Sequence, residues 1–239
     1  ALGLLLDPER GGLLRRGGTI VEGPPGKTGT GPAPPGASRG YRTIITMPQT
    51  QSREKIDALR VTGADVRLVP AVPYANPDHY AHQARRLAEA INAADPGSAW
   101  FANQFDNTAN RDFHEATTGV EIWEQCGGRI DGFVCATGTG GTLAGAGRAL
   151  KSRNPAVAIA LADPAGSALA SWINTGELKA EGASISEGIG SSRITANFDG
   201  APVDLAWSIA DTESVPWVHA LIHEEGINAG GSSGGNVAG

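Results

Sequence analysis

Short apolar runs alternate with longer amphipathic stretches along most of the chain. The short runs are rich in β-branched residues, which favour strands, and the longer stretches repeat apolar residues every three or four positions, which favours helices. Strand alternating with helix predicts an α/β fold whose sheets are mostly parallel, with helices on both faces. The predicted strands cover residues 19–22, 42–47, 65–69, 99–103, 132–136, 158–162 and 205–209.

Polar and proline-containing turns mark the ends of the predicted helices. Asn-Pro-Asp at residues 76–78 begins one helix, and Asp-Pro-Gly at residues 95–97 ends it. Ser214 begins another, with Pro216 in its first turn, and Gly226 ends it. Two more helices are predicted, a surface helix at residues 51–60 and one that runs from Leu143 to about Leu150.

The alternation fails between residues 24 and 40, where a helix is due. This stretch holds five prolines and five glycines and almost no apolar side chains, so we expect a loop or disorder there. Part of it, Gly26-Lys27-Thr28, looks like the end of a phosphate-binding P-loop. A P-loop requires a further glycine at a position where this chain has Val21, and a helix that the prolines would interrupt. Nucleotide binding is therefore the function that the sequence supports least.

Composition limits the choice of partner. The chain of 239 residues is 40% hydrophobic, enough for one large domain or two modest ones. Its net charge of -6 argues against nucleic acid or an anionic membrane as a partner and favours a small soluble ligand. No apolar run approaches the ~18 residues of a membrane helix, and the first residues lack a signal-peptide cleavage site. We therefore expect a cytoplasmic protein.

The two cysteines, Cys126 and Cys135, lack the spacing of a metal or redox motif. We expect free, buried thiols in a reducing compartment, and a disulfide framework is excluded. Because Cys135 precedes a glycine-rich loop, a reactive thiol is the alternative to a small buried side chain there.

Two pairs of histidines are close enough in sequence to be considered as metal ligands. They are His79 with His82, and His219 with His223 four positions apart on one face of a predicted helix. A zinc site needs a third protein ligand, and none is in view. We predict surface pairs and no metal site.

Clusters of glycine mark the candidate site. Residues 138–142 (Gly-Thr-Gly-Gly-Thr) follow a predicted strand and precede a predicted helix. Backbone amides at such a junction point inward, glycine allows close approach, threonine hydroxyls add donors, and the helix dipole favours negative charge. A second cluster, residues 230–234 (Gly-Gly-Ser-Ser-Gly), also follows a strand-like run. The residues themselves thus predict a site for a phosphate group at 138–142.

Five segments, in this order, resemble those of the cysteine synthase and cystathionine β-synthase family of pyridoxal-phosphate enzymes. They are YRTIITMPQTQSREKIDALRVTGADVRLVP, NQFDNTANRDFHEATTGVEIWEQ, GTGGT, SEGIGSSRI and GGSSG. The resemblance implies the tryptophan-synthase-β type of fold, with two open, mostly parallel sheets, incomplete at both ends of this chain. It further implies a smaller mobile domain at residues 1–106, which carries the substrate loop, and a larger cofactor-anchoring domain at residues 107–239.

The resemblance also implies roles for individual residues. Ser232 would contact the pyridine nitrogen of the cofactor, where a hydroxyl leaves the ring largely unprotonated and favours β-elimination over transamination. Thr28 and Gln104 would bind the substrate carboxylate, and Gly188 would line the active-site entrance. The cofactor phosphate would be held by Gly138, Thr139, Gly140, Gly141 and Thr142.

The reaction that the resemblance implies is a β-replacement that forms cysteine. An amino acid such as O-acetylserine or serine binds to pyridoxal 5′-phosphate, a lysine removes its α-proton, and the β-substituent leaves. Sulfide or another thiol nucleophile then adds in its place. By the same resemblance the protein is expected to be a homodimer.

The family's Schiff-base lysine has no counterpart within the chain. The lysines at positions 27, 55, 151 and 179 lie outside the family's Asn-Pro-x-x-Ser-x-Lys setting, and alignment of the first residues places the expected lysine a few positions before Ala1. In the substrate loop Lys27 replaces the family's asparagine, and prolines replace the helix that follows. We interpret Lys27 as a solvated charge. A catalytically impaired fragment or pseudoenzyme that still binds the cofactor phosphate is the alternative function.

Overall fold

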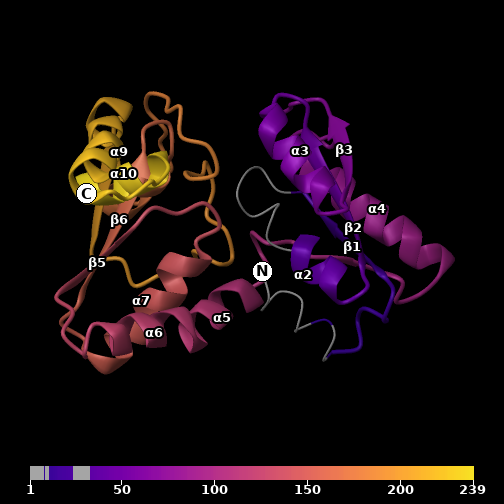
Figure 1. The fold of residues 1–239 in the computed structure, drawn as a ribbon, viewed down its shortest axis with the longest axis horizontal. Coiled ribbons are helices and arrows are strands. Elements are labelled where there is room, and N and C mark those ends of the chain that lie inside the picture. Colours follow the sequence, from indigo (N-terminus) through magenta and orange to yellow (C-terminus); the bar gives the residue numbers. More distant parts are fainter. Residues whose placement is uncertain (1–7, 9–10, 24–32) are drawn as a thin grey trace. The chain divides into compact units, whose positions relative to one another are not determined.

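Two compact units make up the chain, residues 1–109 and residues 110–239. The structure, a computed structural model, describes residues 8, 11–23 and 33–239. Each unit contains one sheet, and every strand pair in the described part of both sheets is parallel (Figure 1). The predicted α/β class with two parallel sheets is therefore confirmed.

The sheet of the first unit has the strand order β3-β2-β1-β4. Its strands are β1 (Thr19–Glu22), β2 (Arg42–Pro48), β3 (Asp65–Val69) and β4 (Ala99–Phe101), and its helices are α2 (Ala33–Ser38), α3 (Arg53–Val61) and α4 (Tyr80–Ala94). Thr19 is paired with Arg42 on one side and with Ala99 on the other, so β1 lies inside the sheet. The end of β1 therefore lies between the middle of β2, where Glu22 pairs with Ile45, and the end of β4, where Val21 pairs with Phe101.

Adjacent residues of β2 show why both faces of this sheet are covered. Successive side chains of a strand point to opposite faces. Ile44 packs against Ala84 and other residues of α4, whereas Ile45 packs against Ile56 and other residues of α3. Helices on both faces bury every residue of β2 after Arg42, which explains why apolar and polar residues do not alternate along this strand.

Two predictions in the first unit need correction. β4 ends at Phe101 and not at Asn103, because Asn103 adopts a left-handed conformation with φ of 47°, which an extended strand cannot contain. Residues 33–38, expected to be loop or disorder, form the short helix α2. Pro34 and Pro35 lie in its first turn, where the missing amide hydrogen costs no intrahelical bond. Thr28, Lys27 and the rest of residues 24–32 lie outside the described residues.

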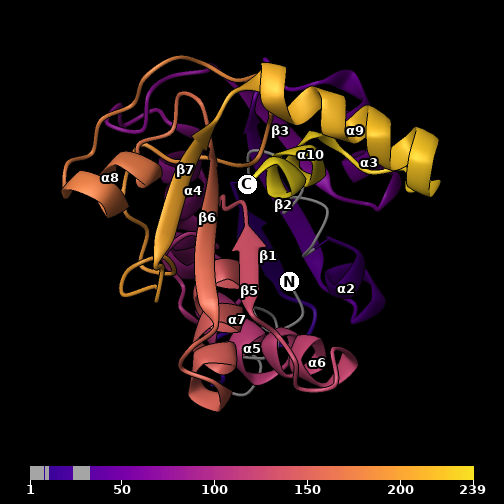
Figure 2. The same cartoon turned by 90° about the vertical axis from the view of Figure 1, so that its left-hand side faces the viewer.

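The second unit has the strand order β5-β6-β7, and Figure 2 shows these strands side by side. Ile159 and Leu161 of the central strand and Leu143 and Leu150 of α7 are fully buried in its core. The strands are β5 (Gly132–Cys135), β6 (Ala158–Pro164) and β7 (Leu205–Ile209). The helices are α5 (Ala109–Ala116), α6 (Thr118–Gln125), α7 (Gly141–Arg153), α8 (Leu169–Thr175), α9 (Asp211–Glu225) and α10 (Gly231–Ala238).

Two further predictions fail in the second unit. α9 begins at Asp211 and not at Ser214, so Pro216 lies inside the helix and not in its first turn. Asp211 and Glu213 occupy the first turn, where carboxylates interact favourably with the helix dipole. The strand-like run before Gly230 is not a strand, because the chain leaves α9 through left-handed Gly226 and enters α10 directly.

The two cysteines differ in exposure. Cys135 is buried, as expected, but Cys126 is exposed because it is the residue that ends α6 at the surface. Neither cysteine forms a disulfide. Among the described residues, no helix has both the length and the apolar character needed to cross a membrane.

Candidate functional site

The glycine-rich loop at residues 138–142 connects β5 to α7. α7 begins at Gly141, and Gly140 precedes it in the left-handed conformation, with φ of 90°. A Cβ atom at Gly140 would lie 2.6 Å from the Cβ of Phe198. A Cβ atom at Gly138 would lie 2.5 Å from the carbonyl oxygen of Gly188. Glycine is therefore required at position 140 both by the backbone conformation and by the space available.

Several backbone amides of this loop lack an acceptor among the described residues. Within the described part of the chain, no hydrogen bond is donated by the amides of Gly138, Thr139, Gly140 and Thr142. The amide of Gly141 donates to Oγ1 of Thr139 at 3.3 Å. Unpaired amides at the start of a 13-residue helix offer donors and the positive end of a dipole to an anion. The loop therefore fits the phosphate group of a cofactor.

A neighbouring segment, residues 188–198, holds this loop in place. The amide of Gly190 donates to the carbonyl oxygen of Thr137 at 2.7 Å. The hydroxyl of Thr195, which is buried, donates to the carbonyl oxygen of Thr139 at 2.6 Å. Because both acceptors are backbone atoms of residues 137–139, these contacts determine the direction in which the loop amides point. Gly188, which was expected at the entrance, lies directly against Gly138.

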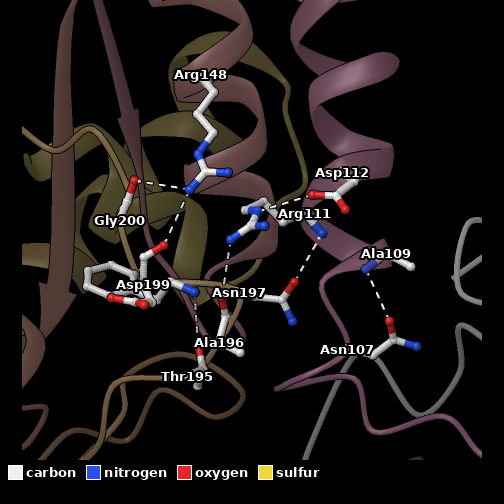
Figure 3. A network of polar contacts seen from close by, with 11 residues as sticks. Asn107, Ala109, Arg111, Asp112, Arg148, Thr195, Ala196, Asn197, Asp199 and Gly200 are labelled. Carbon is white, nitrogen blue, oxygen red and sulfur yellow. Dashed lines mark hydrogen bonds and ion pairs between the residues drawn. The ribbon is translucent and has the colours of Figure 1, made fainter.

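A polar network anchors the far end of that segment (Figure 3). The buried carboxamide of Asn197 accepts from the amide of Arg111 at 3.1 Å, and the guanidinium of Arg111 donates to the carbonyl oxygen of Ala196 at 3.3 Å. Arg148 of α7 donates to the carbonyl oxygens of Asp199 and Gly200. The segment is thus tied to α5 and α7, the two helices next to the loop.

The second glycine cluster forms the start of α10. Ser232 lies in the first turn of this helix and is half-buried. The side chain of Asn236, one turn later, accepts a hydrogen bond of 2.5 Å from the amide of Ala136 at the end of β5. Ser186, Ile189 and Gly231 line one pocket of the second unit. The structure therefore brings α10, residues 186–189 and the end of β5 together.

Gln104 lies in the first unit, where its surroundings contain a residue that sequence reasoning missed. The amide of Gln104 donates to Oε2 of Glu22 at 3.1 Å, and the amide of Gly23 donates to Oε1 of Glu22 at 2.7 Å. Both side chains are almost completely buried. Burial raises the pKa of Glu22 to about 7, although the two amide bonds oppose this shift. Glu22 thus connects the end of β1 to the segment that carries Gln104.

The other candidate side chains show no catalytic arrangement. Burial raises the pKa of Cys135 to about 11, so the thiol form predominates at neutral pH and a reactive thiolate is not supported. His219 and His223 are stacked with ring centroids 6.4 Å apart. His79 is buried and accepts from the amide of Ala81, so it caps α4 and is not part of a surface pair. Among the described residues, no cluster of three or more potential ligands could hold a metal.

The site residues that the sequence did not predict all bond to distant parts of the chain. Glu22, Thr195, Asn197 and Asn236 each bond to backbone atoms of another segment of the chain. The partners lie far away in sequence, so no local motif reveals them. The one available signal is that polar residues directly follow or interrupt apolar runs, as Glu22 does after Ile20 and Val21 at the end of β1.

Comparison with known proteins identifies the family. The model of the pyridoxal-phosphate dependent enzyme family matches residues 1–239. The chain therefore belongs to this family, and the resemblance noted from its motifs is confirmed. It is 49% identical to cysteine synthase 1 of Neurospora crassa over 99% of the chain and 63% of that protein.

Other relatives carry related names. Cysteine synthase 1 of Emericella nidulans is 48% identical over 99% of the chain and 64% of that protein. Cystathionine beta-synthase of Oryctolagus cuniculus is 38% identical over 100% of the chain and 42% of that protein. The chain thus spans less than two thirds of the length of these relatives.

Proposed function

We propose that the protein forms cysteine by a pyridoxal-phosphate-dependent β-replacement on an activated serine, either O-acetylserine or serine. Sulfide or another thiol is the proposed nucleophile. The observation that carries this proposal is the loop at 138–142, whose unpaired amides at the start of α7 suit a phosphate group in a chain of this enzyme family. The names of the relatives support the choice of cysteine as product.

In this proposal each candidate residue has one task. The amides and hydroxyls of residues 138–142 bind the cofactor phosphate and orient the ring. Ser232 donates its hydroxyl hydrogen to the pyridine nitrogen, Gln104 and Thr28 bind the substrate carboxylate, and Gly188 borders the entrance. When bound, the cofactor supplies an electron sink for the α-carbon of the substrate.

Glu22 supports Gln104 from within the protein. Its carboxylate accepts from the amides of both Gly23 and Gln104, so it sets the position of the two segments that follow β1 and β4. Because Glu22 is almost completely buried, its own role is to position residues and not to contact substrate.

The two units would divide these tasks. We propose that residues 1–106 form the smaller, mobile substrate domain and residues 107–239 the cofactor-anchoring domain. The phosphate loop and Ser232 both lie in the unit that begins at residue 110, and Gln104 lies in the other, which supports this division. We further propose a cytoplasmic homodimer. Two free cysteines support a reducing compartment, and light scattering tests the dimer.

The test uses the purified protein with any coding sequence that precedes Ala1 retained. It is mixed with pyridoxal phosphate, O-acetylserine and sulfide, and cysteine is quantified. Cysteine formation that depends on pyridoxal phosphate is expected. Binding of pyridoxal phosphate without cysteine formation would favour the non-catalytic alternative. Failure to bind pyridoxal phosphate, with ATP bound instead, would overturn the proposal in favour of a nucleotide-binding function.

A further inference from the structure

Helix α5 directs two polar side chains at the threonines of the phosphate loop. Nδ2 of Asn110 lies 3.0 Å from Oγ1 of Thr139. Nε2 of His114, one turn further along α5, lies 3.2 Å from Oγ1 of Thr142. No local motif in the sequence predicts these contacts, because α5 and the loop are about thirty residues apart.

Helix α5 lies beside α7 (Figure 1), and two glycines of α7 allow this close approach. A Cβ atom at Gly141 would lie 2.6 Å from Nδ2 of Asn110, and one at Gly145 would lie 2.3 Å from the carbonyl oxygen of Arg111. Real Cβ atoms do not approach so closely, so the two helices are in direct backbone contact. The positions of Asn110 and His114 relative to the loop are therefore set by rigid elements and not by flexible side chains.

The hydroxyl hydrogen of Thr139 has no acceptor among the described residues. A hydroxyl oxygen can accept two hydrogen bonds and donate one. Oγ1 of Thr139 accepts from Nδ2 of Asn110 at 3.0 Å and from the amide of Gly141 at 3.3 Å. Both acceptor positions are occupied, and the described residues provide no acceptor for the hydroxyl hydrogen. By donating to Oγ1 of Thr139, Asn110 leaves this hydroxyl free to act only as a donor to a ligand.

His114 can do the same for Thr142. Its Nδ1 lies 2.8 Å from Oγ1 of Thr118, so the ring stands between two hydroxyls. Burial lowers the pKa of His114, which keeps the ring neutral at pH 7 with one nitrogen protonated. If Nε2 carries the hydrogen, Thr118 donates to Nδ1, Nε2 donates to Thr142, and the hydroxyl hydrogen of Thr142 remains for a ligand.

We propose that Asn110 and His114 are positioning residues that turn the hydroxyl hydrogens of Thr139 and Thr142 toward the cofactor phosphate. His114 acts in its Nε2-protonated form. The inference rests on the proposed function of the loop as a phosphate site. It assigns to α5 a task that the loop motif alone does not contain, since the loop supplies the hydroxyls but not their orientation.

The first experiment measures the dissociation constants of pyridoxal phosphate and of pyridoxal, which lacks the phosphate. Asn110→Ala should weaken binding of pyridoxal phosphate roughly tenfold and change binding of pyridoxal less than about twofold. Thr139→Val should do the same, and the double variant should be no weaker than Thr139→Val alone, because Asn110 acts through that hydroxyl. Asn174→Ala is the matched control, since Asn174 donates to the carbonyl oxygen of Ala206 away from the loop.

The second experiment replaces His114 by glutamine or by asparagine, whose side-chain amides differ in length. The Nε2 of a glutamine occupies the place of the histidine Nε2, whereas asparagine is too short to reach Thr142. His114→Gln should keep the affinity for pyridoxal phosphate within about twofold, and His114→Asn should lose roughly tenfold. His219→Gln is the control on an exposed histidine of α9. The ¹⁵N shifts of the unaltered protein should show a neutral His114 protonated at Nε2 when pyridoxal phosphate is bound.

The outcomes separate this inference from the proposed function. If the unaltered chain does not bind pyridoxal phosphate, both fail. If it binds but the Asn110 and His114 variants bind pyridoxal phosphate normally, or lose affinity for pyridoxal equally, only the positioning role is overturned. Protonation of His114 at Nδ1 in the bound state would also overturn it, and this result does not depend on how any variant folds.

Discussion

Replacing Gly140 by alanine tests whether the phosphate loop depends on the geometry at the start of α7. An alanine at this position meets two separate penalties. A left-handed conformation, here with φ of 90°, costs a residue with a Cβ atom about 1–2 kcal/mol. The new Cβ would also lie 2.6 Å from the Cβ and 2.7 Å from the backbone nitrogen of Phe198. Overpacking of a rigid neighbour costs about 1–3 kcal/mol more.

The expected loss in the free energy of unfolding of the second unit is therefore about 2–5 kcal/mol. Gly176→Ala provides the control, because Gly176 has φ of 78° in the same unit and its Cβ would meet nothing within 4 Å. It should lose only the conformational part, about 1–2 kcal/mol. Gly235→Ala, in a helix with open space around it, should be neutral or stabilising by up to about 1 kcal/mol.

Unfolding in guanidinium, followed by fluorescence and circular dichroism, measures the free energy of unfolding of the three variants. Binding of pyridoxal phosphate should also be lost from Gly140→Ala and retained by the other two, because only Gly140 lies in the loop. The reasoning is refuted if Gly140→Ala is no less stable than Gly176→Ala, or if it binds pyridoxal phosphate as the unaltered chain does.

Further predictions concern Glu22, the two cysteines and Thr195. The pKa of Glu22 is raised from 4.5 to about 7, so its contribution to stability is fully present below pH 4.5 and is lost as the pH rises to about 7. Glu22→Gln should remove this dependence from unfolding curves measured between pH 4.5 and 8; an unchanged dependence would contradict the assignment. Because the pKa of Cys135 is raised to about 11 and Cys126 is exposed, a thiol reagent at pH 8 should modify Cys126 alone in the native protein and both cysteines after unfolding. Fast modification of both in the native protein would show that Cys135 is accessible. Thr195→Val should cost about 1 kcal/mol of stability and weaken binding of pyridoxal phosphate, through loss of the 2.6 Å bond to Thr139. Thr175→Val, which removes a bond to Ser171 in α8, should leave that binding unchanged.

Regular elements could be predicted because their signals are local. The strands that become β1, β3 and β7 have the predicted bounds, since short runs that contain β-branched or aromatic residues specify them. Boundaries that depend on a single backbone conformation could not be predicted. Asn103 in its left-handed conformation shortens β4, and α9 begins three residues earlier than predicted, at Asp211, although Pro216 then lies inside it.

The candidate site likewise has a part that could be predicted from the sequence and a part that could not. The loop at 138–142 was visible from the sequence because glycine spacing and the strand–helix junction are local properties. The residues that orient the loop were not visible. Asn110 and His114 reach it from α5, and Thr195 reaches it from a segment with no regular secondary structure. Such contacts exist only after the chain has folded, so periodicity and spacing contain no information about them.

The measurement that tests the account most directly is a titration of the ¹⁵N-labelled protein with pyridoxal phosphate, followed through the backbone amide resonances of the loop. Pyridoxal without phosphate is titrated in parallel. The account predicts large shifts for the amides of residues 138–142 with pyridoxal phosphate and small shifts with pyridoxal. Equal shifts with both compounds, or none at residues 138–142, would contradict the claim that this loop binds the cofactor phosphate.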